Sequence, residues 1–500
     1  MMGRLINLSL LVLAISMITP NNPFKTAGAF SIIGYLVTVT IIPRVGNSFI
    51  KIGLKGRDMS KSGNPPEIPE TMGVVSAITY LFLMFGMIPF VFFKYLVSYS
   101  NLANDAYQTN NYLEQYESID DTKLFPHNKL SQYLSAIICL QGTILLGLFD
   151  DLFDIRWRHK FFLPAVASLP LLIVYYVDFS VTSIVIPSFV TSHIPFGLGD
   201  VLLSILNEVV RLGNHAATYV TGLSFNTLST DFLVPKDDPK LLDLGIFYYI
   251  YMSAISIFCP NSINILAGIN GLEVGQSVVL SIIFLLNDFC YLFTLDSNSA
   301  AYDSHLFSMI FLVPFLGVSL GLLRFNWFPS KVFVGDTYCY FSGMVFAQVG
   351  ILGHFSKTLL IFFLPQIINF IYSVPQLFHI VPCPRHRLPK YNAKDNLMYP
   401  SYGEISALSG KKLASATFLL KTFSFFKFID LKKDPQGNIT EFSNMTIINL
   451  NLVWFGPLRE DTLCMLILSQ QLVLGVTMIL VRHTIGPWLF GYDNLTFRIK

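Results

Sequence analysis

A group of ionisable side chains follows an apolar stretch in the segment LFDDLFDIRWRHK, residues 148–160. Asp150 and Asp151 are adjacent, Asp154 follows Asp150 by four residues, and Lys160 ends the segment. Carboxylates four residues apart share a helix face and repel each other unless a metal ion or a basic side chain lies between them. One Asp at a helix end is commonly only a solvated terminus, whereas this density of charge indicates a functional site.

A second group consists of amide side chains in NSINILAGINGLE, which contains Asn261, Asn264, Asn270 and Glu273. Two glycines interrupt the helical pattern and let the backbone approach a ligand closely. Amide oxygens are hard ligands that suit Mg²⁺, but Asn side chains also join membrane helices by hydrogen bonds. From the residues alone, both interpretations of this segment stay open.

A third candidate is Asp336, which follows Gly335 at the start of an apolar run in FNWFPSKVFVGDTYCYF. A carboxylate flanked by apolar residues at that depth is costly and is by default a functional residue. Mg²⁺ typically takes one or two protein ligands and completes its coordination shell with water and substrate phosphates. Asp336 together with an Asn oxygen fits that pattern.

A fourth group lies in the loop VPCPRHRLPK, which presents Arg385, His386 and Arg387 between prolines. The prolines stiffen the loop, so its basic side chains lose little entropy on binding a ligand. Arg guanidinium groups bind a pyrophosphate in a bidentate manner. A basic loop beside a membrane also attracts anionic lipid head groups, but that role requires neither the prolines nor the central His.

The elements that position these residues are membrane helices. The chain has 500 residues, of which 53% are hydrophobic and only 13% charged, whereas average soluble domains carry about 25% charged residues. Apolar runs of about 18 or more residues indicate transmembrane helices. The sequence therefore predicts an all-α polytopic membrane protein with about ten spans, near residues 26–43, 73–93, 131–149, 161–177, 244–264, 273–293, 305–323, 333–352, 358–380 and 461–481.

Several other classes of site and segment are not supported. The six cysteines are scattered without the paired spacing of a disulfide framework or a zinc site, and no basic tract with interleaved aromatics indicates nucleic-acid binding. The first apolar run, Leu5 to Thr19, is short for a span and lacks a small-residue cleavage site. We interpret it as a retained extension or an interfacial segment.

The distribution of basic residues orients the chain, because loops rich in Lys and Arg face the cytoplasm. Of the 33 Lys and Arg residues, 21 lie in four connections: 44–72, 150–160, 324–331 and 381–460. The polar groups described above therefore lie on the cytoplasmic side. Arg57, Asp58 and Glu70 share that side in a loop that is uninformative by itself.

The same assignments predict four parts of the chain: an N-terminal extension (1–25), a transmembrane catalytic core of nine helices (26–380), a small mixed cytoplasmic insertion for substrate recognition that includes the basic loop (381–460), and a last helix with a lumenal tail (461–500). The glycosylation sequons at Asn438 and Asn444 fall in the cytoplasmic insertion. We interpret them as chance matches, because that face is not glycosylated.

Four long motifs occur in order along the chain: RWRHKFFLPAVASLPLL, NSINILAGINGLEVGQS, FVGDTYCYFSGMVFAQVGILGHFSKT and PCPRHRLP. Together they resemble the polyprenyl-phosphate sugar-1-phosphate transferase superfamily (glycosyltransferase family 4), in particular its tunicamycin-sensitive eukaryotic branch. The resemblance runs from about Thr26 to about Val481. It implies an enzyme that transfers GlcNAc-1-phosphate from UDP-GlcNAc to dolichyl phosphate, the first step of lipid-linked oligosaccharide synthesis for N-glycosylation.

The resemblance also implies the setting of that activity. The protein would be a multi-pass protein of the endoplasmic reticulum membrane whose active site faces the cytoplasm. Its cofactor would be Mg²⁺, and it would form a homodimer in contact with membrane lipid. A further implied partner is the next GlcNAc transferase of the pathway.

Individual roles follow from the same resemblance. The expected catalytic residues are Asp150, Asp151 and Lys160. The expected Mg²⁺ ligands are Asn264 and Asp336. UDP-GlcNAc would be bound by Arg57, Asp58, Met59, Glu70, Asn270, Phe333, Arg385, His386 and Arg387. Dolichyl phosphate would be bound by Lys160, Ile257, Phe258, Cys259, Pro260, Asn261, Ser262, Ile263, Asn264 and Ile265.

Two mechanisms are open at this point. In the first, the lipid phosphate attacks the β-phosphate of UDP-GlcNAc directly, with Asp150 or Asp151 as base or orienting group. In the second, one of these Asp residues is itself the nucleophile. We favour direct attack, because two bound substrates need no covalent relay.

Three other functions compete with this one. A sister enzyme with another sugar nucleotide or polyprenol is disfavoured by the PCPRHR loop. A transporter or scramblase would gather its charges near the bilayer midplane rather than at one mouth. A catalytically inactive scaffold would have no need for the complete set of Asp150, Asp151, Asn264 and Asp336.

Overall fold

The structure is a computed structural model of the chain. It describes residues 2–19, 22–58, 65–93, 96–97, 126–186, 198–223, 241–296, 299–384, 387–405 and 410–490.

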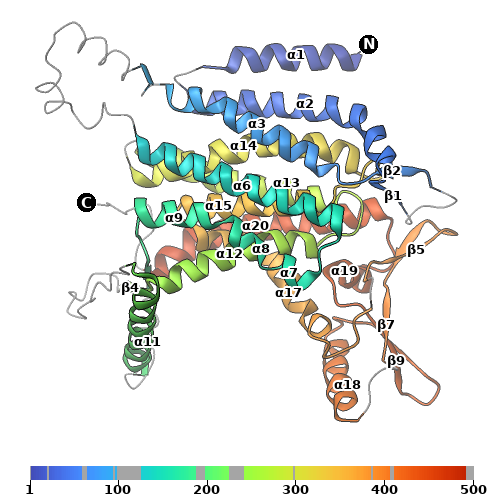
Figure 1. The fold of residues 1–500 in the computed structure, drawn as a ribbon. Helices are drawn as coiled ribbons and strands as arrows, with labels where there is room; N and C mark the ends of the chain where they lie inside the picture. Colours follow the sequence, from blue (N-terminus) through green and yellow to red (C-terminus); the bar gives the residue numbers. More distant parts are fainter. Residues whose placement is uncertain are drawn as a thin grey trace, which may run out of the picture.

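The molecule is built around a bundle of long apolar helices (Figure 1). Within the described residues, eight helical stretches are long and apolar enough to cross a bilayer, and a bent pair makes up to nine. The eight are α2 (Pro23–Lys51), α3 (Gly73–Val91), α6 (His127–Phe153), the broken stretch Arg158–Asp178, α12 (Ile246–Ile265), α13 (Leu272–Thr294), α14 (Ala300–Asn326) and α20 (Glu460–Phe490). The prediction of an all-α polytopic membrane protein is confirmed.

Prolines interrupt two of the predicted spans. The stretch Arg158–Asp178 consists of the end of α7 (Trp157–Lys160), α8 (Leu163–Ala167) and α9 (Leu169–Asp178), and Pro164 and Pro170 lie in the first turns of α8 and α9. The bent pair is α16 (Ser356–Phe362) and α17 (Leu364–Leu377), which meet at 67°. Pro365 lies in the first turn of α17, where its missing N–H and its ring favour a break.

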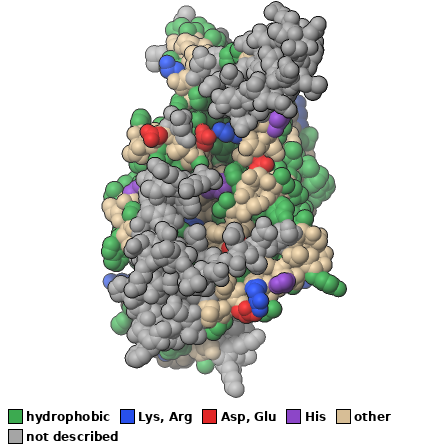
Figure 2. Space-filling model, turned by 90° about the vertical axis from the view of Figure 1, so that its left-hand side faces the viewer, with side chains coloured by type: hydrophobic (Ala, Val, Ile, Leu, Met, Phe, Trp, Pro, Cys, Tyr) green, Lys and Arg blue, Asp and Glu red, His purple; other side chains and the backbone are tan. Residues whose placement is uncertain are grey.

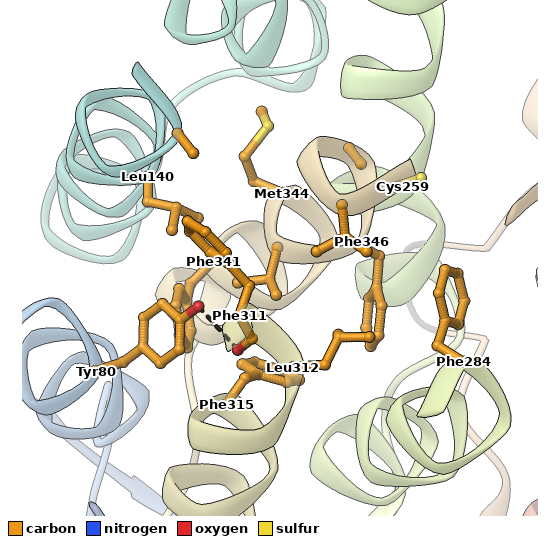
Figure 3. Close-up of a cluster of buried hydrophobic side chains, with 14 of the residues drawn as sticks. Tyr80, Leu140, Cys259, Phe284, Phe311, Leu312, Phe315, Phe341, Met344 and Phe346 are labelled. Atoms are coloured by element: carbon orange, nitrogen blue, oxygen red, sulfur yellow. Dashed lines mark hydrogen bonds between the residues drawn. The ribbon is translucent and has the colours of Figure 1, made fainter. Parts of the chain in front are cut away.

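The remaining predicted span, α15 (Asp336–Leu352), is the centre of the bundle. Every residue after Asp336 in this 17-residue helix is buried. Figure 3 shows Phe341, Met344 and Phe346 of α15 packed among aromatic side chains of its neighbours. There the hydroxyl of Tyr80 donates to the carbonyl of Phe311 over 3.0 Å, so a buried polar group is satisfied inside the core.

The N-terminal apolar run forms α1 (Met2–Met17), which lies alongside α2 at the edge of the bundle (Figure 1). Leu5, Leu8, Val12 and Ile15 are exposed on it. This segment is therefore a helix packed against the bundle, and it presents an apolar face outward.

Small extramembrane elements mark the two ends of the bundle (Figure 1). The hairpin end, as we call it, carries the antiparallel pair β1 (Lys55–Arg57) and β2 (Glu67–Pro69) together with the chain between α17 and α20. The α11 end carries the antiparallel pair β3 (Ser183–Val185) and β4 (Leu241–Asp243) and the helix α11 (Leu198–Thr221).

The chain between α17 and α20 forms a small mixed unit. Its strands pair antiparallel as β5 with β6 and as a sheet in the order β7-β9-β8, and α18 and α19 complete it. The bounds are β5 (Lys390–Asn392), β6 (Leu397–Tyr399), β7 (Tyr402–Glu404), α18 (Gly410–Phe425), β8 (Leu431–Lys433), β9 (Ile439–Ser443) and α19 (Ile447–Phe455). Asn444 is buried and its amide group bonds Ser401 and Gln376, so in the fold its sequon is inaccessible.

Close approach of α12 and α15 predicts a stability effect at Gly343. A Cβ atom there would lie 2.3 Å from the backbone of Pro260, which cannot move aside as a side chain can. We expect Gly343→Ala to lower the free energy of unfolding by about 1–3 kcal/mol. Thermal unfolding of the detergent-solubilised protein measures the effect.

The matched control is Gly142→Ala on α6, where the new Cβ would meet Ala167 at an ordinary contact distance of 3.5 Å. Equal melting temperatures for the two variants would contradict the packing of α12 on α15.

Candidate functional site

An ion-pair bridge lies at the hairpin end of the bundle. The Nζ atom of Lys160 is 2.8 Å from Oδ2 of Asp150 and 2.9 Å from Oδ2 of Asp336. The side chain of Asp150 is almost fully buried, while those of Lys160 and Asp336 retain 18% and 30% of their exposure. An ammonium group thus joins α6 to the start of α15 and stays accessible to a ligand.

A tight turn after α6 brings Lys160 to this position. The helix ends at Phe153, and Asp154 adopts a left-handed conformation with φ of 48°. Oδ1 of Asp150 then accepts a hydrogen bond from the backbone N–H of Ile155, which fixes the turn into α7. The expectation that Asp150 and Asp154 share a helix face is wrong, because the helix stops between them.

Asp151, which follows Asp150 in the sequence, accepts hydrogen bonds from the start of α15. Its oxygens accept hydrogen bonds from the backbone N–H of Asp336 (2.6 Å) and from the N–H and hydroxyl of Thr337 (3.1 and 2.5 Å). Unpaired N–H groups at a helix start favour such a carboxylate. Gly147 permits the approach, since a Cβ there would lie 2.6 Å from the backbone of Thr337.

Hard oxygen ligands gather at the same point. The side chain of Asn264, near the end of α12, lies beside the carboxyl group of Asp336. The described residues include no group of three His, Cys, Asp or Glu side chains that could hold a metal ion. One carboxylate and one amide are the donor set of a cation that keeps water and substrate phosphates in its shell, as Mg²⁺ does, and not of zinc.

The side chain of Asn261, the neighbouring amide in the same motif, hydrogen-bonds to backbone carbonyl groups. Its Nδ2 donates to the carbonyl of Phe161 over 3.3 Å and to that of Ile257 over 2.8 Å. Asn261 therefore ties α12 to the turn that follows Lys160. This is the helix-joining role that the sequence left open for these Asn residues.

A buried polar network adjoins the site and joins three distant parts of the chain. Nδ2 of Asn270 donates to Oδ2 of Asp58 over 2.7 Å, and its backbone N–H donates to Oε1 of Glu460 over 2.7 Å. Glu460 was missed from the sequence, because a Glu at the start of a helix commonly serves only the helix dipole. Glu273 is partly buried and lies near Asp336 and Glu460, and its position in the Asn-rich motif was the only signal for it.

The hairpin of β1 and β2 borders the same site. The ring of Phe333 lies about 3 Å from the position that a Cβ on Gly56 would occupy, so a larger residue there would displace the ring. The backbone N–H of Phe333 donates to the carbonyl of Pro69 over 2.8 Å. Burial and the charge of Asp336 raise the pKa of neighbouring Glu70. Arg57 points to Glu67, with 3.3 Å between Nη2 and Oε1.

The basic loop reaches the Asn-rich motif through Leu388, whose side chain packs over Gly268. Nη1 of Arg387 is buried and has no hydrogen-bond partner among the described residues. Burial lowers the pKa of this guanidinium group. An anion at Nη1 would relieve that penalty.

The structure thus brings together Asp150, Lys160, Asn264 and Asp336. Asp151 adjoins this group through its hydrogen bonds to the start of α15. Met59, Arg385 and His386 lie outside the described residues.

Burial subdivides the predicted lipid-binding segment of α12. Cys259, Pro260, Asn261, Ser262 and Ile263 are buried within the protein. The partly exposed members are Ile257, Phe258, Asn264 and Ile265.

Known proteins resemble this chain over nearly its whole length. The model of the family described as Glycosyl transferase family 4 matches residues 133–354. The UDP-N-acetylglucosamine–dolichyl-phosphate N-acetylglucosaminephosphotransferase of Saccharomyces cerevisiae is 49% identical over 496 residues, with 99% of each chain covered. The proteins of the same name from Schizosaccharomyces pombe and Dictyostelium discoideum are 44% and 37% identical, with 97% and 89% of this chain and 97% and 85% of the relatives covered.

The capping role of Asp151 yields a prediction that concerns structure alone. Asp151→Ala removes the acceptor of three hydrogen bonds at the start of α15, so we expect about 1–2 kcal/mol lower stability. Backbone hydrogen exchange at Asp336 and Thr337 should accelerate, as followed by mass spectrometry of the detergent-solubilised protein. Asp151→Asn, which keeps an acceptor, should give an intermediate result.

Asp154→Asn is the control, since it neutralises an exposed carboxylate of the same segment and keeps a residue type that tolerates the left-handed backbone. Unchanged exchange at Thr337 in Asp151→Ala would refute the capping role.

Proposed function

Because the chain belongs to glycosyl transferase family 4, together with the dolichyl-phosphate N-acetylglucosaminephosphotransferases it resembles, we propose that it transfers GlcNAc-1-phosphate from UDP-GlcNAc to dolichyl phosphate. The products are GlcNAc-diphosphodolichol and UMP. The observation that carries the proposal is the bridge of Lys160 between Asp150 and Asp336, with Asn264 beside it. This arrangement places an ammonium group that can bind a phosphate next to oxygen atoms that can bind a metal ion, at one end of the membrane bundle.

In the proposed reaction an oxygen of dolichyl phosphate attacks the β-phosphorus of UDP-GlcNAc. A new P–O bond forms, and the bond from the β-phosphorus to the bridging oxygen breaks, so UMP leaves with the electron pair. Such phosphoryl transfers depend mainly on positioning and charge stabilisation. The chain therefore has to hold two anionic substrates in line.

Lys160 is the residue that we assign to the lipid phosphate. Its ammonium group is held between two carboxylates and keeps part of its surface open to a ligand. Asp150 orients Lys160 and is the acceptor for any last proton on the lipid phosphate, whose second pKa lies near neutrality. Asp151 acts as a positioning residue, because both of its oxygens are engaged by α15. This division of roles favours direct attack over a covalent Asp intermediate.

Asn264 and Asp336 are the residues that would hold Mg²⁺, and the ion would supply charge neutralisation at the pyrophosphate. Carboxylate and amide oxygens are ligands that Mg²⁺ prefers. Asp336 is carried at the first position of α15, where Asp151 fixes the backbone. The position of the ligand therefore depends on that cap.

We assign the network of Asp58 and Asn270 and the ring of Phe333 to the uridine, with Arg57, Met59 and Glu70 around it. The basic residues of the PCPRHR loop (Arg385, His386 and Arg387) are assigned to the pyrophosphate and the sugar. Support comes from the buried Nη1 atom of Arg387 and from the contact of Leu388 with Gly268. Dolichyl phosphate would contact the partly exposed residues of α12, such as Ile257 and Phe258.

The proposed setting is the endoplasmic reticulum membrane, with the hairpin end in the cytoplasm. The 21 Lys and Arg residues of the connections at that end support this orientation. The homodimer and the contact with the next GlcNAc transferase remain part of the proposal.

The direct test is an assay of the purified protein with UDP-GlcNAc labelled in the sugar, dolichyl phosphate and Mg²⁺. We expect a labelled lipid product that disappears when Mg²⁺ is chelated, returns on its addition and is suppressed by tunicamycin. A panel of other UDP-sugars separates this activity from that of a sister enzyme. No product from any sugar nucleotide with folded protein would overturn the assignment.

Asp336→Asn is expected to lower kcat/KM by roughly a hundredfold or more, because it removes a charge from the proposed metal site. The Mg²⁺ concentration needed for half-maximal activity should rise in any residual activity. Glu441→Gln serves as the control, since the ion pair that Glu441 forms within the described residues is one with Lys432 at the surface. Equal losses in the two variants would speak against a role for Asp336 in the reaction.

Arg387→Lys is expected to raise the KM for UDP-GlcNAc about tenfold, because an ammonium group cannot reproduce the guanidinium fork. Arg459→Lys is matched to it, since Arg459 is exposed in an ion pair with Asp461. Initial rates over a range of UDP-GlcNAc concentrations give both values, and an unchanged KM in Arg387→Lys would remove Arg387 from the sugar-nucleotide site.

A further inference from the structure

The motif FVGDTYCYFSGMVFAQVGILGHFSKT contains two parts that lie at opposite ends of the molecule. Its first part carries Asp336, and its last part, Gly353 to Thr358, follows the other end of α15. The helix between them has 17 residues, which is roughly 26 Å at 1.5 Å per residue. The second part of the motif therefore has no contact with the reaction site.

A pocket of about 220 Å³ opens where these residues lie, at the α11 end of the bundle. Its walls come from the ends of α9, α12, α13, α14 and α20 and from the turn between α15 and α16. Tyr175, Phe179, Tyr248 and Phe355 make much of the lining aromatic. Figure 2 looks onto this end of the molecule, where Lys or Arg, His, and Asp or Glu atoms are all visible among apolar side chains.

The charge of the pocket lining is positive. Lys357 and Arg482 line it, and the lining residues include no carboxylate among the part of the chain that the structure describes. Lys357 is exposed, and its ammonium group has no acceptor within that part. Arg482 donates from Nε to the hydroxyl of Thr358 over 3.3 Å, which fixes the guanidinium beside the pocket.

The buried carboxylate of Asp288, next in sequence to the lining residue Asn287, is engaged by other side chains. Its oxygens are engaged by Nδ1 of His305 at 2.7 Å and by the hydroxyl of Ser308 at 2.5 Å. His305 is in turn stacked between Tyr291 and Phe355. Asp288 itself is not among the lining residues, whereas its neighbour Asn287 and its partner His305 are.

Asn287 is an independent sign of a ligand. Its side chain is only 1% exposed, yet neither its Nδ2 nor its Oδ1 has a hydrogen-bond partner among the described residues. Leaving a buried amide unpaired is unfavourable, so such groups are usually satisfied by water or a ligand. Ala300 and Ala301, in the first turn of the long helix α14, line the same pocket and add the positive end of its dipole.

We propose that this pocket is a second binding site that takes a phosphate group, presented by a phosphorylated lipid or as free phosphate. Lys357 and Arg482 supply its charge, and the amide of Asn287 supplies a hydrogen-bond donor. The aromatic lining accommodates the apolar body of a lipid, as in other largely apolar pockets with a few polar anchors. The site is separate from the transferase site, and the proposal does not rest on the proposed function.

The test is the thermal stability of the full-length protein in detergent, with dioctanoyl phosphatidic acid, dioctanoylglycerol or inorganic phosphate as the added probe. A ligand that binds only the folded state raises the melting temperature in proportion to its occupancy. We expect phosphatidic acid to stabilise the protein and the matching diacylglycerol, which lacks the phosphate, to have no comparable effect. Stabilisation by inorganic phosphate to the same extent would identify the free anion as the ligand.

The variants are Lys357→Gln and Lys357→Glu, in which the exposed side chain can be replaced without loss of core packing. The apparent Kd for the phosphate-bearing probe should rise at least about tenfold in the first and binding should be lost in the second. Lys25→Gln is the control, because it removes an exposed lysine from the same end outside the pocket. Equal weakening in Lys357→Gln and Lys25→Gln, or no phosphate-dependent stabilisation at all, would overturn the proposal.

Discussion

The start of α15, held by the carboxylate of Asp151, is the constraint on which the catalytic end depends. The first N–H groups of a helix have no partner inside the helix, and here they meet an acceptor from α6 over 2.6 and 3.1 Å. Because Thr337 and every later residue of α15 are buried, the N–H of Thr337 depends on this acceptor rather than on water. The cap therefore fixes at once the packing of α6 on α15 and the position of Asp336.

The charged side chains of the proposed active site surround the ion-pair bridge made by Lys160. Lys160 joins Asp150 to Asp336, while Glu70 and Glu273 lie close enough to influence the same region electrostatically. Several carboxylates around one ammonium group leave an excess of negative charge, which a divalent cation would offset. The α11 end has the converse arrangement, since Lys357 and Arg482 line a pocket to which no described carboxylate contributes. The same central helix connects these two polar regions.

The proposed sugar-nucleotide site is assembled from widely separated parts of the chain. Asp58 follows β1, Asn270 lies before α13, and Glu460 begins α20, yet they form one hydrogen-bonded network. Short loops at one mouth of the bundle allow this convergence, because the ends of neighbouring spans necessarily lie together. The small unit between α17 and α20 contributes Arg387 to this site. Its neighbour Leu388 packs over Gly268 and so places the basic loop next to the Asn-rich motif.

The sequence by itself determined the class of fold and the inventory of the site. Apolar runs report spans because a bilayer admits only backbone that is hydrogen-bonded within itself, and isolated charges beside such runs are too costly to be incidental. Asp150, Asp336 and Asn264 were therefore identifiable by residue type and position along the chain. The breaks in the spans at Pro164, Pro170 and Pro365 were less evident, because their hydropathy remains apolar across each break.

Tertiary structure decided the roles within that inventory. Adjacent Asp150 and Asp151 are equivalent in sequence, but one pairs with Lys160 and the other caps α15, since successive residues of a helix face different neighbours. Asn261 and Asn264 divide in the same way into a helix tie and a neighbour of Asp336. The partners of Asn270 and the pocket around Lys357 come from residues distant in sequence, and no local pattern encodes which of them meet.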